Sequence, residues 1–81
     1  MKTMDFIGEL NDLGFGVSYR LTDIHIVKSG FLRRKVARVS YMRVNDKEIN
    51  SRALNRMKPE VREKLLKLIS DYASTPIEER K

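Results

Sequence analysis

The first apolar positions of the chain recur at helical spacing, which predicts an amphipathic helix over residues 4–13. The expected buried face of this helix carries Phe6, Ile7, Leu10 and Leu13. Gly14 follows at the position where a glycine in the left-handed conformation commonly ends a helix. The chain is therefore expected to turn sharply after its first helix.

The next residues alternate between apolar and polar side chains, which is the period of half-buried strands. Residues 15–21 form the first expected strand and residues 24–28 the second, and Ser29-Gly30 predicts the hairpin turn that follows. The expected core faces carry Phe15, Val17, Tyr19 and Leu21 in the first strand, and Ile24 and Ile26 in the second.

The third expected strand, residues 31–44, has no clean alternation on either face. We prefer the phase that turns Ala37, Val39 and Tyr41 towards the core, so that residues 31–35 overhang as a projecting hairpin tip. The alternative is a bulge or break near Ser40 that divides the segment into two short strands.

The longest expected helix covers residues 59–74, where Pro59 suits the first helical position. Its apolar stripe consists of Val61, Leu65, Leu68, Ile69 and Tyr72. Pro76 ends the helix, so we expect one domain over residues 1–75 and a short tail over residues 76–81 that is dispensable for folding. The order α-β-β-β-α predicts an α+β fold, with three or four antiparallel strands packed against the N-terminal helix and the long C-terminal helix.

Composition narrows the class of protein. A chain of 81 residues is expected to form one domain with a small core, which leaves little room for an enclosed active site. The absence of cysteine excludes disulfides, thiolate metal sites and a cysteine nucleophile. No apolar run reaches the roughly 18–20 residues that span a bilayer, and the first residues do not resemble a signal peptide. The expected location is the cytoplasm, with no membrane partner.

The net charge of +6 is concentrated in one segment. Residues 20–47 carry eight basic and two acidic side chains, which accounts for the whole excess. Such a local excess attracts nucleic acid or an acidic protein surface.

Residues with catalytic potential are few. His25 is the only histidine, and no flanking motif supplies a nucleophile that it could orient. Asp5, Glu9 and Asp12 follow one side of the first helix, as is typical of a solvated helix face. Nucleotide-binding and zinc-binding motifs are absent. We therefore expect a protein that is not an enzyme and that uses no cofactor and no metal.

The strongest functional signal is the basic second hairpin with the residues around it. The predicted binding residues are Lys28, Phe31, Arg33, Arg34, Lys35, Arg38, Tyr41 and Arg43. The basic side chains would contact phosphates, and the two aromatic rings would stack on bases. The competing interpretation is that these charges protect a sheet edge from pairing with other strands. A second basic set, on residues 52–67, alternates with acidic residues and is more typical of a solvated helix face.

Both ends of the chain resemble a group of small phage and prophage proteins of Gram-positive bacteria, most of them uncharacterised. The resemblance is carried by Leu13-Gly14-Phe15 and by the C-terminal sequence YASTPIEER, residues 72–80. It does not extend over residues 28–58, and it transfers no functional residue. It implies a phage-type accessory protein of the bacterial cytoplasm.

These observations favour a binding protein whose basic hairpin engages nucleic acid or a host protein that handles nucleic acid. One concrete form is an inhibitor of host defence, like the proteins that block CRISPR nucleases. The alternatives are a direct DNA- or RNA-binding accessory protein of phage replication or regulation, and a small assembly protein that forms homodimers through its helices.

Overall fold

The computed structural model describes residues 1–28 and 34–81. The elements are α1 (Thr3–Asp12), β1 (Phe15–Arg20), β2 (Asp23–Lys28), β3 (Lys35–Ser40), β4 (Lys47–Ile49), α2 (Ser51–Asn55), α3 (Pro59–Ala73) and the 3-10 turn η1 (Ile77–Glu79). The strands form one antiparallel sheet in the order β1-β2-β3-β4. This architecture confirms the predicted α+β class, with β4 as the fourth strand.

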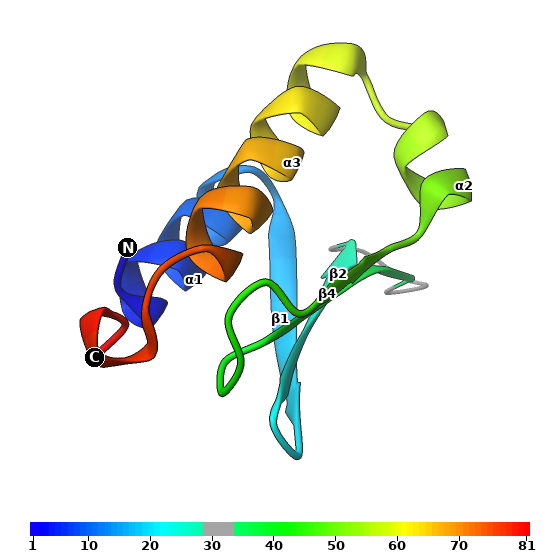
Figure 1. The fold of residues 1–81 in the computed structure, drawn as a ribbon. Coiled ribbons are helices and arrows are strands. Elements are labelled where there is room, and N and C mark those ends of the chain that lie inside the picture. Colours follow the sequence, from blue (N-terminus) through cyan, green and yellow to red (C-terminus); the bar gives the residue numbers. More distant parts are fainter. Residues whose placement is uncertain (29–33) are drawn as a thin grey trace.

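The helices and the sheet form two layers. α1 and α3 contact each other and lie against the same face of the sheet (Figure 1). Between the layers lies a core to which every long element contributes, including Phe6 and Leu10 from α1, Ile24 and Ile26 from β2, and Leu65 from α3. Within the described ranges, no helix is long and apolar enough to cross a membrane.

The helix ends follow the sequence signals. Gly14 has a φ of +94°, a conformation that strains residues with a Cβ, and it turns the chain from α1 into β1. Pro59 occupies the first turn of α3. The rings of Phe6 and Tyr72 stack with centroids 4.3 Å apart, which joins α1 to the end of α3.

The third strand is shorter than the sequence pattern predicts. Ser40 is buried, and its hydroxyl oxygen accepts hydrogen bonds from the backbone N–H groups of Met42 (3.1 Å) and Arg43 (3.0 Å). These local bonds turn the backbone away from the sheet, so β3 ends at Ser40 and not near Val44. The break near Ser40 that we considered as the alternative is therefore present, but residues 41–44 do not form the expected second strand, and the next strand, β4, begins only at Lys47.

The ambiguous phase of this strand has a structural cause. The register shifts between Ile26 and Val27, where β3 carries an extra residue opposite β2. Both Val36 and Ala37 are consequently buried, although strict alternation would expose one of them. Ala37 and Val39 face the core as predicted, whereas Tyr41 is only half-buried.

The C-terminal tail is packed, in contrast to the expectation that it is dispensable. Arg80 is 4 % exposed, and its guanidinium lies 4.4 Å from the centre of the Tyr72 ring. Its carbonyl oxygen accepts a hydrogen bond of 2.8 Å from the backbone N–H of Thr3. The guanidinium donates to four backbone carbonyls, those of Ser40 (2.8 Å), Thr75 (3.0 Å), Ala73 (3.0 Å) and Arg43 (3.4 Å). The tail thus links the start of α1, the end of α3 and the end of β3.

Candidate nucleic-acid interface

The base of the second hairpin brings three of the predicted residues together. The backbone N–H of Lys28 donates to the carbonyl of Arg34 at 2.8 Å, and Lys35 pairs with Val27 in the sheet register. The side chains of Lys28, Arg34 and Lys35 are all exposed. The antiparallel pairing of β2 and β3 therefore places three cations at one end of the sheet.

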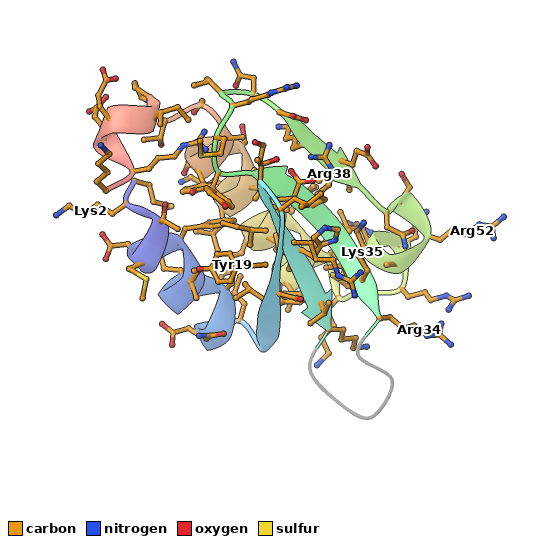
Figure 2. All side chains as sticks on the ribbon, turned by 90° about the horizontal axis from the view of Figure 1, so that it is seen from below. Lys2, Tyr19, Arg34, Lys35, Arg38 and Arg52 are labelled. Carbon is orange, nitrogen blue, oxygen red and sulfur yellow. The ribbon has the colours of Figure 1, made fainter. Side chains whose placement is uncertain are left out.

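A fourth cation reaches the same end from α2. Asn50 donates from its backbone N–H to the carbonyl of Val36 (2.9 Å) and from its side-chain amide to the carbonyl of Lys35 (3.3 Å). The same side chain accepts the N–H of Ala53, so the start of α2 is held beside β3. The exposed Arg52 projects from the same side of the molecule as Arg34 and Lys35 (Figure 2).

We call Lys28, Arg34, Lys35 and Arg52 the basic end. Sequence reasoning assigned Arg52 to a solvated helix face and so missed it. The only local signal was Asn50-Ser51, which predicts a helix start but not its place beside β3. Among residues 1–28 and 34–81, every ion pair involves Arg38, so no carboxylate is within ion-pair distance of these four side chains.

Arg38, which the sequence assigned to phosphate binding, is not a free cation in the structure. Its guanidinium contacts the carboxylates of Asp46 (3.0 Å), Asp23 (3.1 Å) and Glu48 (3.3 Å) on the open face of the sheet. Hydrogen bonding to Asp46, followed by the charge of Asp23, raises the pKa of Arg38. Three carboxylates around one guanidinium leave this part of the surface with an acidic excess, which repels phosphate.

Two further predicted residues lie at the opposite end of the sheet. The backbone N–H of Tyr41 donates to the carbonyl of Thr22 in the β1–β2 turn, and its hydroxyl donates to the carbonyl of Leu21 at 2.7 Å. Its ring and that of Tyr19 form a T-shaped pair, with centroids 6.3 Å apart. Tyr41 and the exposed Arg43 therefore do not belong to the basic end. Phe31 and Arg33 lie outside the described residues.

His25 lies on the open face of the sheet, opposite Arg38 in the register. Burial lowers the pKa of His25, and the positive charges of Lys35, Arg20 and Arg38 lower it further, against the opposing effect of Asp23. The imidazole is therefore neutral at pH 7. Within the described part of the chain, no side chain forms a hydrogen bond with this ring, and no group of three or more His, Asp or Glu side chains is placed to hold a metal ion.

No protein family, curated protein or solved structure matches this chain. Its function must therefore be argued from the arrangement of its own residues.

Proposed function

We propose that this chain is a non-enzymatic binding protein that engages nucleic acid through the basic end. The observation that carries the proposal is the gathering of four exposed cations from β2, β3 and α2 at one place, without acidic neighbours in ion-pair contact. The acidic residues of the sheet surround Arg38 instead. Cations that make no internal pairs are the groups that bind phosphates, because they lose no existing ion pair on binding.

The type of contact follows from the residue types. Arg34 and Arg52 present planar guanidinium groups that can bind phosphate oxygens in pairs, whereas Lys28 and Lys35 act as point charges. Such contacts provide affinity and orientation without reading base sequence. We therefore propose binding that depends strongly on salt and weakly on sequence.

The resemblance at both ends of the chain supports a phage-type role in the bacterial cytoplasm. There, a small protein that covers a nucleic acid would compete with host enzymes for the same phosphates. Inhibition of a host defence nuclease, including a CRISPR effector, is the form of this role that we propose. The fold itself does not assign it, because one fold hosts many functions.

Fluorescence anisotropy with labelled single-stranded and double-stranded DNA of random sequence tests the binding. With four phosphate contacts, the slope of log K against log salt should be about −3 to −4. The double variant Arg34→Gln/Lys35→Gln should lower the magnitude of this slope by roughly 1.5–2 and should weaken binding.

Arg43→Gln/Lys47→Gln is the matched control, because it removes the same charge from the opposite end of the sheet. It should leave the slope nearly unchanged. Equal effects of the two variants would mean that only the net charge attracts DNA, and absence of binding to both DNAs at low salt would overturn the proposal. Binding by the wild type only to an acidic protein would overturn it in favour of a protein partner.

A further inference from the structure

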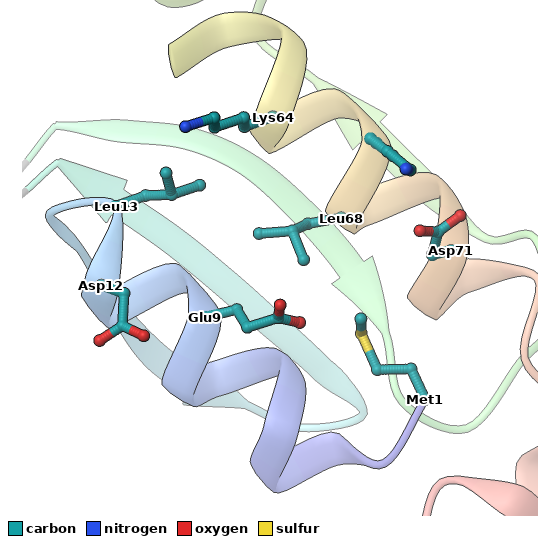
Figure 3. Close-up of a pocket in the computed structure, with 8 residues that line it drawn as sticks. Met1, Glu9, Asp12, Leu13, Lys64, Leu68 and Asp71 are labelled. Atoms are coloured by element: carbon teal, nitrogen blue, oxygen red, sulfur yellow. The ribbon is translucent and has the colours of Figure 1, made fainter. Parts of the chain in front are cut away.

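A groove of about 350 Å³ runs between α1 and α3. The half-buried side chains of Leu13 and Leu68 lie within it, between charged side chains of the two helices (Figure 3). Glu9 and Asp12 on α1 form what we call the acidic rim. Lys64 and Lys67 on α3 form the lysine rim. The groove therefore has an apolar strip with two carboxylates on the α1 side and, on the α3 side, two lysines followed by Asp71.

The two rims do not neutralise each other inside one molecule. All four rim side chains are exposed, and in the described part of the chain the ion pairs all belong to Arg38. Each rim is therefore available to a charged surface that enters from outside.

The charged side chains of the two helices lie at corresponding positions along the length of the groove. Figure 3 shows Asp12 and Leu13 at the end where Lys64 lies, and Met1 and Asp71 at the other end. Glu9 and Leu68 lie between these ends. A two-fold rotation about an axis parallel to the groove leaves the position of each side chain along the groove unchanged and places α1 of one copy over α3 of the other. The acidic rim of each copy therefore faces the lysine rim of the other copy.

We propose that the occupant of this groove is a second copy of the chain, in a two-fold dimer. α1 of each copy packs over α3 of the other, so that Asp12 faces Lys64 and Glu9 faces Lys67 of the second copy. Leu13 and Leu68 of both copies then meet in the middle and leave water. A surface that complements itself in this way is what an isologous interface requires.

Asp71 agrees with the same geometry. It lies at the level of Met1, whose terminal ammonium is held by the Thr75 hydroxyl at 3.1 Å. The two-fold rotation brings Asp71 opposite the start of α1 of the second copy, where that ammonium and the positive end of the helix lie. The dimer buries the helix layers and leaves the open faces of both sheets outside, and it does not depend on the proposed function.

Analytical ultracentrifugation of nuclease-treated protein over a range of concentrations tests the dimer. The wild type should show a concentration-dependent dimer that weakens with salt. Glu9→Lys/Asp12→Lys gives two positive rims and Lys64→Glu/Lys67→Glu gives two negative rims, so each variant alone should sediment as a monomer. An equimolar mixture of the two should form heterodimers, because each positive rim then meets a negative one.

Glu60→Lys/Glu63→Lys, a change of equal charge on the exposed surface of α3 outside the groove, should leave the dimer intact. Thermal melting of each variant confirms that it is folded. A wild type that remains monomeric at every concentration would overturn the proposal. So would heterodimers that fail to form from two folded variants, because the interface would then lie elsewhere or be occupied by a different protein.

Discussion

Arg80 has a structural role, although the sequence places it in a tail that is expected to be dispensable for folding. It is one residue from the C-terminal Lys81, yet its guanidinium is buried and satisfies four carbonyls. We expect Arg80→Ala to lower the free energy of unfolding in urea by about 2–4 kcal/mol, because it leaves buried carbonyls without donors. Arg80→Lys should recover only part of this loss, since an ammonium lacks the planar fork.

The control for Arg80 is its exposed neighbour. Lys81→Ala should change the free energy of unfolding by less than about 0.5 kcal/mol. If Arg80→Ala proves equally mild, water replaces the guanidinium at little cost and the tail is not a structural link.

Leu21 has both its backbone and its side chain in energetically unfavourable states. It has a φ of +53° and is 95 % exposed at the β1–β2 turn. Leu21→Gly should raise the free energy of unfolding by roughly 0.5–1 kcal/mol, because glycine adopts positive φ without a Cβ clash. Asn45→Gly, at a φ of +60°, should gain less in the same denaturation experiment, since asparagine tolerates this region. A loss of stability in Leu21→Gly would show that the leucine side chain packs in solution.

At the scale of elements, α3 shows how a helical stripe is divided between core and solvent. Leu65 is fully buried, Leu68 is half-buried in the groove, and Leu66 is 39 % exposed. Leu65→Ala should cost about 2–4 kcal/mol of unfolding free energy, through lost burial and the cavity that remains. The same change at Leu66 should cost well under 1 kcal/mol, and chemical denaturation compares the two directly. Similar costs at both positions would mean that the helix is rotated about its axis.

The strands show where the alternation of apolar and polar residues fails to predict the bounds of a strand. β1 and β2 match the expected ranges to within one residue, because their alternation is regular. β3 was predicted to run towards Val44, but the Ser40 hydroxyl turns the chain, and the register shift at Ile26 breaks the alternation. Both effects depend on contacts between strands or on one side chain, which a period of two does not encode.

At the scale of the whole molecule, the dependence of stability on pH reports the burial of His25 and the charges around it. The pKa of His25 lies below 6.5 in the folded state, by burial first and then by the nearby cations, of which Lys35 has the largest effect. The unfolded chain, with an ordinary pKa, binds the proton more readily. Stability is therefore complete above about pH 7 and falls as the pH drops below about 6.5.

His25→Gln should flatten this part of the profile in urea titrations between about pH 7.5 and 5.5, a window above the ordinary range of carboxyl titration. An unchanged slope in the variant would mean that another group titrates there.

The candidate site was only partly predictable. The charge excess of residues 20–47 pointed to the second hairpin, and Lys28, Arg34 and Lys35 do gather at its base. Arg52 could not be found, because it reaches the basic end through the pairing of Asn50 with β3. The neutralisation of Arg38 was equally hidden, since its acidic partners come from two separate segments of the chain, Asp23 from one and Asp46 and Glu48 from the other.

The sequence alone determined the first helix, the first two strands, the long C-terminal helix and the α+β class, since hydrophobic periodicity, Gly14 and Pro59 act over one or two turns of chain. The tertiary structure decided which charges are free and which are paired, where β3 ends, and that Arg80 belongs to the core. The physical reason is the distance along the chain between the residues that interact. A helix or strand is specified by neighbours a few residues apart, whereas burial and ion pairing depend on groups that only the folded chain brings within a few ångströms.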